Sequence, residues 1–175
     1  MKVNLKQKQH PVEVINNQYD KNLLCTAPLH FLPEIRRKLE SQYNVTYAFR
    51  SSSDNLIKLL DDTNIWILDP GANYSINAKL LSYAKNLEIL VSPSTGSDHV
   101  DLDFCKNNNI AFDCLRGKED IISNIHASAE FSFALLLAMV RHMIPSAYAA
   151  EEGYWRELED NFRGIEIAES TIGLI

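Results

Sequence analysis

The sequence predicts an α/β fold with a mainly parallel sheet. Short apolar runs alternate with amphipathic stretches along the first two thirds of the chain, and turn-forming residues separate them. Strands connected by helices of this length form crossover connections, which make the strands parallel and cover both faces of the sheet. We expect strands at residues 23–27, 45–49, 65–68, 87–92 and 110–113.

The segments between these runs are predicted to be helical. In residues 32–43, Ile35 and Leu39 lie four positions apart on one face, while charged side chains occupy the other face. Ser53 or Asp54 is expected to cap the next helix. The remaining elements expected are helices at residues 76–84 and 101–106, and an edge strand or hairpin at residues 12–15.

The chain changes character after Cys114. Residues 115–120 have the composition of a charged loop, and residues 125–143 that of a long apolar helix that Pro145 closes or kinks. We therefore expect a first domain at residues 1–115, and residues 116–175 to leave it and pack against something else. Residues 170–175 begin a strand without further partners downstream, so the sequence gives the impression of being interrupted there.

Composition and charge argue against several classes of protein. The formal net charge is -6 and no basic block stands out, which argues against a nucleic-acid partner. The longest apolar run, residues 134–140, is far shorter than the roughly 20 residues of a membrane span, and residues 1–10 lack the apolar core of a secretory signal. Cys25, Cys105 and Cys114 are scattered, so we expect core side chains, no metal site and a cytoplasmic location.

Two loops carry the residues best suited to bind a ligand. Residues 69–74 follow the third expected strand and residues 92–98 follow the fourth, at the edge where open α/β sheets bind ligands. Their small residues and glycines allow backbone N–H groups to approach a carboxylate or phosphate closely. The alternative interpretation is that both are plain strand-to-helix turns, with Ser97 or Asp98 as a helix cap.

Several ordered segments resemble the D-isomer-specific 2-hydroxyacid dehydrogenase family, which includes the phosphoglycerate dehydrogenases. The family's turn of a small residue, Thr or Val, and Gly, followed by an acidic or amide residue and Val/Ile-Asp, is similar to Ser94-Thr95-Gly96-Ser97-Asp98-His99-Val100-Asp101-Leu102. Residues 127–141 resemble its Ala-Glu, leucine-rich and Ala-x-Arg stretch, and residues 171–175 match the strand that leads into Gly-x-Gly-x-x-Gly. The resemblance covers residues 87–175, whereas the first 86 residues agree only in their βαβ rhythm.

The resemblance implies a flavodoxin-like substrate domain, followed by the crossing helix and first strand of a truncated Rossmann domain. It further implies the N-terminal portion of an NAD(P)-dependent oxidoreductase that interconverts a D-2-hydroxy acid and a 2-oxo acid, with NAD or NADP as cofactor. The family's catalytic arginine, glutamate and histidine follow its glycine loop. We therefore expect no catalytic and no cofactor-binding residue in this chain, which should be inactive by itself.

The resemblance also implies a substrate site and a partner. Backbone amides of the two loops hold the substrate carboxylate in this family, and they correspond here to Ala72, Asn73, Ser94, Thr95 and Gly96. Gly71 stands near where phosphoglycerate dehydrogenases place an arginine, and residues 115–125 form a longer stretch than theirs, so both features argue against 3-phosphoglycerate as substrate. The family implies a homodimer through the helix at residues 127–143.

Other polar and aromatic side chains are expected to have structural roles. A glutamate inside an apolar helix needs hydrogen-bonding partners, so we expect Glu130 to connect its helix to a neighbouring loop. The others are His99 and His126 as solvated or helix-terminal histidines, His142 as the polar end of the long helix, Trp155 as a packing anchor or dimer contact, and Met139 and Met143 as core fillers.

Two other functions fit part of the pattern. The first is a stand-alone, non-enzymatic flavodoxin-like module that binds a small acid or a partner protein. The second is a receiver-like signalling domain, for which Asp69 is suitably placed after the third strand. A receiver also needs an acidic pair after its first strand, which Cys25-Thr26-Ala27 does not offer, so the second alternative is the weaker one.

Overall fold

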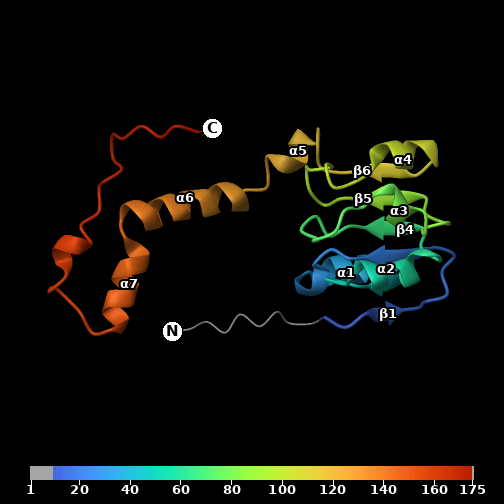
Figure 1. Ribbon diagram of the computed structural model, residues 1–175, viewed down its shortest axis with the longest axis horizontal. Helices are drawn as coiled ribbons and strands as arrows, with labels where there is room; N and C mark the ends of the chain where they lie inside the picture. Colours follow the sequence, from blue (N-terminus) through green and yellow to red (C-terminus); the bar gives the residue numbers. More distant parts are fainter. Residues whose placement is uncertain (1–9, 175) are drawn as a thin grey trace. The chain divides into compact units, whose positions relative to one another are not determined.

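A computed structural model describes residues 10–174 and divides the chain into two compact units, Met1–Glu119 and Asp120–Ile175 (Figure 1). The sequence placed the boundary a few residues earlier, after residue 115. The short helix α5 (Glu119–Ile122) lies at the boundary. Each unit is described by itself.

The first unit contains a six-stranded sheet in the order β1-β3-β2-β4-β5-β6. Its five parallel strands confirm the predicted α/β class, and without β1 their order is the 2-1-3-4-5 order of flavodoxin-like folds. The edge strand predicted at residues 12–15 is β1, which pairs antiparallel with β3. The strands are β1 (Glu13–Ile15), β2 (Asn22–Cys25), β3 (Asn44–Tyr47), β4 (Ile65–Ile67), β5 (Ile89–Val91) and β6 (Ala111–Asp113).

Side chains cap three of the helices between the strands, α2 (Ser53–Leu60), α3 (Ala78–Leu81) and α4 (Leu102–Asn107), at positions that the sequence located only in part. Ser52, rather than Ser53 or Asp54, caps α2 by accepting a hydrogen bond from the Asn55 amide. The third predicted helix is shorter than expected because Ile76 forms a parallel bridge with Val100, and the helix begins only after this bridge. The helices are α1 (Pro33–Glu40), α2 (Ser53–Leu60), α3 (Ala78–Leu81) and α4 (Leu102–Asn107), preceded by a 3-10 turn, η1 (Leu29–Phe31).

The core of the first unit consists of two hydrophobic clusters. Successive residues of β2 belong alternately to one cluster and to the other. Leu24 belongs to the larger cluster with Trp66, whereas Leu23 and Cys25 belong to the smaller cluster with Val45. Successive side chains of a strand point to opposite faces, so both faces of the sheet are covered. Each fully buried leucine contributes roughly 1.5–3 kcal/mol to stability. This two-sided burial fixes the strand register and therefore the positions of the loops at the strand ends.

The second unit contains α6 (Ala127–Val140), α7 (Met143–Glu151) and a 3-10 turn, η2 (Glu159–Asn161). The predicted long helix is interrupted at His142, whose φ of 49° is left-handed, and not at Pro145. Pro145 lies in the first turn of α7, where a missing N–H leaves no intrahelical bond unmade. Residues 171–174 form no strand, since no neighbouring strand pairs with them.

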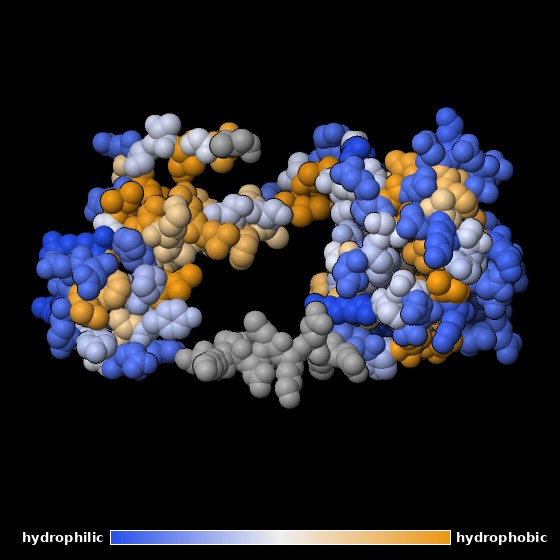
Figure 2. All heavy atoms as spheres, viewed as in Figure 1, coloured by the Kyte–Doolittle hydropathy of each residue, from blue (hydrophilic) through white to orange (hydrophobic). Residues whose placement is uncertain are grey.

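Helix α6 exposes an apolar surface. Phe131, Phe133, Leu135 and Met139 are each more than half exposed, and Figure 2 shows hydrophobic atoms gathered over this helix. Among residues 10–174, no single helix is long and apolar enough to cross a bilayer; α6 and α7 pass that test only together, by length and composition, with a bend of 63° between them.

Candidate functional site

The carboxyl ends of β2, β3 and β4 surround a pocket of about 360 Å³. The sheet order reverses at β2, because β3 lies on one side of it and β4 on the other. Open α/β sheets bind ligands at such a switch point, outside the carboxyl ends of the strands. The pocket is lined by Pro28 after β2, by Phe49, Arg50 and Ser51 after β3, and by Asp69, Gly71, Ala72, Asn73 and Tyr74 after β4.

Thr26 fixes the loop after β4 to the end of β2. Its hydroxyl donates to the Ile67 carbonyl at 3.2 Å and accepts from the Trp66 indole N–H and the Asp69 amide, both at 3.0 Å. One donor and two acceptor positions are all that a threonine hydroxyl offers, so this buried group is fully satisfied. The first residue of the pocket loop is therefore held at a defined position.

An Asx turn and a partly buried tyrosine further define the loop after β4. The Asp69 carboxylate accepts the Gly71 amide at 2.9 Å, an Asx turn that orients the loop. Burial raises the pKa of Tyr74 to about 12. The Tyr74 phenol therefore remains protonated near neutral pH and offers the pocket a hydrogen-bond donor.

The loop after β5 is fixed by different contacts. The Leu115 amide donates to the Ser94 carbonyl at 2.9 Å, and the Arg116 Nε donates to the Thr95 carbonyl at 3.2 Å. A Cβ built at Gly96 would meet nothing within 4 Å, so the backbone there is open to an approaching group. Of the predicted binding residues, Ala72 and Asn73 line the pocket, whereas Ser94, Thr95 and Gly96 lie after the next strand and outside its lining.

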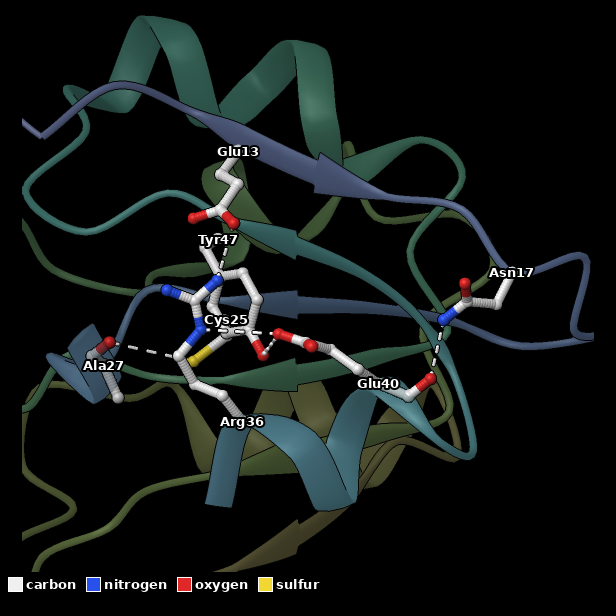
Figure 3. A network of polar contacts seen from close by, with 7 residues as sticks. All are labelled: Glu13, Asn17, Cys25, Ala27, Arg36, Glu40 and Tyr47. Atoms are coloured by element: carbon white, nitrogen blue, oxygen red, sulfur yellow. Dashed lines mark hydrogen bonds and ion pairs between the residues drawn. The ribbon is translucent and has the colours of Figure 1, made fainter. Parts of the chain in front are cut away.

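A network of charged and aromatic side chains holds the edge strand in place (Figure 3). Arg36 on α1 pairs with Glu13 of β1 at 2.7 Å and with Glu40 at 3.4 Å. Its guanidinium lies 4.0 Å from the ring centroid of Tyr47, whose hydroxyl donates to Glu40 at 3.1 Å. Burial raises the pKa of the Cys25 thiol behind this network to about 12, so it is a core residue, as predicted, and not a nucleophile.

Several side chains for which the sequence predicted structural roles have a different burial or different contacts in the structure. Glu130 is exposed and not a buried tie, and Trp155 is 82% exposed and not a packing anchor. His99 was expected to be a solvated or helix-N-terminal histidine. It lies two residues before Asp101, the N-cap of α4, but it is not solvated at Nε2, which is buried and has no hydrogen-bond partner among residues 10–174. His126 occupies the N-cap position of α6 without a side-chain cap bond. The same range contains no group of three or more potential metal ligands.

Three residues of the site, Thr26, Phe49 and Arg50, were not predicted from the sequence, whereas Tyr74 lies in the predicted loop 69–74. Residues 49–51 follow the second parallel strand, and ligand binding was predicted only for the loops after the third and fourth strands. The available signal was the flavodoxin-like strand order itself, which places the second strand next to the first and its loop at the switch point.

Comparison with known proteins agrees with this fold. Residues 23–112 match the family model described as "D-isomer specific 2-hydroxyacid dehydrogenase, catalytic domain". This match covers half of the chain and runs from β2 to β6. The chain belongs to the D-isomer specific 2-hydroxyacid dehydrogenase family.

Individual relatives support the same family. The chain is 28% identical over 144 residues to a chloroplastic/mitochondrial formate dehydrogenase of Arabidopsis thaliana, covering 81% of this chain and 36% of the relative. It is also 28% identical over 144 residues to D-3-phosphoglycerate dehydrogenase of Mycobacterium tuberculosis, covering 82% and 25%. The chain thus spans about a third or less of these curated relatives.

A solved structure shares the fold. D-lactate dehydrogenase from Aquifex aeolicus, complexed with NAD and lactic acid, has a TM-score of 0.60 at 18% identity, with 85% of this chain and 42% of that chain covered. At this identity the similarity establishes the fold alone.

Proposed function

We propose that this chain supplies the substrate-binding part of an NAD(P)-dependent oxidoreductase that interconverts a D-2-hydroxy acid and a 2-oxo acid. The observation that carries the proposal is the pocket at the switch point of the sheet, together with the open backbone at Gly96 after the neighbouring strand β5. Family membership supports the reaction class, because the relatives include dehydrogenases. The stand-alone binding module remains the alternative, and it shares the binding step but not the hydride transfer.

In this proposal the chain holds the acid and does not transfer the hydride. The backbone N–H groups of Asn73, Ser94, Thr95 and Gly96 bind the substrate carboxylate, since successive amides form an anion-binding concavity. The Ala72 amide, predicted to join them, donates to the Asp69 carbonyl at 3.2 Å and closes the turn of the loop instead. The Tyr74 phenol donates at the side of the same pocket. Hydride transfer also needs a general acid or base at the carbonyl oxygen, and we assign none of the described residues to that role.

The cofactor proposed is NAD or NADP, which supplies or accepts the hydride when bound. Residues 1–175 contain no Gly-x-Gly-x-x-Gly, the loop that holds the pyrophosphate of a dinucleotide in Rossmann domains. The residues at hand therefore do not by themselves fit this group, and we assign none of them to cofactor binding.

The proposal is tested by the substitution Gly96→Ala. A methyl group at this position meets no neighbour, so the fold should tolerate it, but it blocks close approach of a carboxylate to the loop backbone. We expect 2-oxo acids to shift the amide resonances of residues 72–73 and 94–96 in NMR titrations of the wild-type chain. The Kd should rise at least about tenfold in the variant, equivalent to about 1.4 kcal/mol.

Gly173→Ala is the matched control, because Gly173 is equally open and lies outside both loops. A wild-type chain whose loop amides ignore every 2-oxo acid would contradict the binding step. The reaction itself is tested in the longest protein that the gene encodes, by following nicotinamide absorbance with D- and L-2-hydroxy acids. Binding without any turnover there would favour the stand-alone module.

We further propose a homodimer formed through residues 127–143. The four large apolar side chains exposed on α6 support it, because a helix that is apolar on all sides is normally buried. We also propose a reducing, cytoplasmic location, in keeping with three cysteines that form no disulfide in the structure.

A further inference from the structure

Arg50 is the cationic side chain of the pocket. It follows β3 in a turn that the Ser51 amide closes on the Ala48 carbonyl at 3.2 Å, and it lines the cavity beside Phe49 and Ser51. The two loops proposed to bind the substrate carboxylate follow β4 and β5. The loop after β3 therefore adds a third wall to the site.

The backbone of Arg50 adopts an unfavourable conformation. Its φ of 58° is left-handed, in the third position of a turn where glycine or asparagine is normally found. A non-glycine residue held in this conformation costs stability, and such residues cluster at binding sites. The role of this residue follows from the contacts of its side chain.

The Arg50 guanidinium has no carboxylate within salt-bridge distance in the described part of the chain. The guanidinium lies over the Phe49 ring, 5.1 Å from the ring centroid. Arg36 differs in this respect, because it pairs with both Glu13 and Glu40. The one acidic group of the pocket, Asp69, accepts the Gly71 amide. The Arg50 guanidinium therefore has its hydrogen-bond donors available to a ligand, and its planar fork suits a carboxylate or phosphate.

The position of Arg50 in the sheet separates it from the amides proposed to hold the reacting end of the substrate. Neighbouring strands lie about 4.8 Å apart. Since β3 is two strands from β4 and three from β5, its loop begins roughly 10–14 Å from the other two. The arginine side chain covers part of this distance, and a substrate covers the rest only if it extends several bonds beyond the reacting carbon.

We propose that Arg50 binds a second anionic group, at the far end of the substrate. The substrate class is then a 2-oxo or 2-hydroxy acid with a distal carboxylate or phosphate, in preference to one with a short or apolar side chain. This inference rests on the proposed function, because it assumes that the first carboxylate binds at the loops after β4 and β5.

The test measures the Kd of three probes by NMR titration of the chain. The probes are 2-oxoglutarate, 3-phosphonooxy-2-oxopropanoate, and 5-methyl-2-oxohexanoate, which has the shape of 2-oxoglutarate but no charge at its distal end. We expect at least one of the two probes with a distal anion to bind at least about tenfold more tightly than 5-methyl-2-oxohexanoate, with amide shifts at residues 50–51 as well as 72–73. The anionic probe that binds more tightly identifies carboxylate or phosphate as the distal group.

Arg50→Gln should abolish the preference for a distal anion while leaving the Kd of 5-methyl-2-oxohexanoate unchanged. Arg50→Gly should do the same and keep or raise the Tm, because glycine relieves the left-handed conformation. Arg37→Gln, which removes one positive charge from the exposed surface of α1, is the control and should keep the preference.

Failure of this inference is distinguishable from failure of the proposed function. If the three probes bind the wild-type chain equally, or if both Arg50 variants keep the preference, the distal anion site is rejected while 2-oxo acid binding stands. If no 2-oxo acid shifts any amide of residues 72–73 or 94–96, the binding step of the proposed function fails, and the inference fails with it.

Discussion

A single hydroxyl group connects the core of the sheet to the pocket. The Trp66 indole N–H and the Asp69 amide both donate to Thr26, so the largest buried side chain and the first residue of the pocket loop share one acceptor. The indole N–H has no water to replace that acceptor, because Thr26 is 1% exposed and Trp66 is fully buried, whereas Asp69 is half-buried. The threonine thus serves stability and site geometry together.

Thr26→Val tests this dual role. Valine has nearly the same shape but leaves two donors without an acceptor, and each buried unsatisfied group costs about 1–3 kcal/mol. We expect the free energy of unfolding to fall by about 2–4 kcal/mol in urea denaturation. Thr26→Ser keeps the oxygen and loses one methyl group, so it should cost only about 1 kcal/mol. Equal losses in the two variants would show that packing, rather than hydrogen bonding, explains the effect.

Among the elements, α6 ends against a segment that is remote in the sequence. The Val140 carbonyl, one of the last of the helix, accepts the Ile165 amide at 3.0 Å. A Cβ built at Gly164 would lie 2.4 Å from that oxygen and 2.7 Å from the Arg141 Cα. Only glycine permits this close approach, and the contact satisfies a carbonyl that the helix itself leaves free.

Gly164→Ala should therefore separate the two segments. Both obstructing atoms belong to the backbone, so a side-chain rotation cannot relieve the clash, and we expect a loss of about 1–3 kcal/mol. The direct measurement is hydrogen exchange of the Ile165 amide, which should lose its protection. Gly173→Ala, at an open position, should leave that amide unchanged. Retained protection in Gly164→Ala would show that the segment adjusts without losing the bond.

The periodic elements could be predicted from the sequence, whereas their ends and the assembled pocket could not. Apolar runs located each parallel strand to within a few residues, because burial on both faces demands them. The break at His142 could not be predicted from the sequence, because the left-handed conformation of a histidine depends on its surroundings and not on the residue type. Arg50 was missed because its importance depends on strand order, which is a property of the whole sheet.

At the scale of the whole molecule, the exposed apolar side chains of α6 are proposed to be buried by a second copy of the chain. The proposed homodimer predicts that Leu135→Glu, which places a charge among the exposed apolar side chains, shifts the chain from dimer to monomer in sedimentation velocity. Gln42→Glu adds the same charge at an exposed position beyond α1 and should leave the dimer intact. A wild-type chain that sediments as a monomer at all accessible concentrations would contradict the proposal.

The antiparallel edge strand has a consequence for solubility. A sheet edge with unpaired N–H and C=O groups is a template for strands of other molecules, and aggregation often starts there. In this protein β1 covers the free edge of β3 with only three residues, and the ion pair between Glu13 and Arg36 connects it to α1. One salt bridge thus helps to keep the backbone of β3 away from other chains, and the edge that remains on this side is only three residues long.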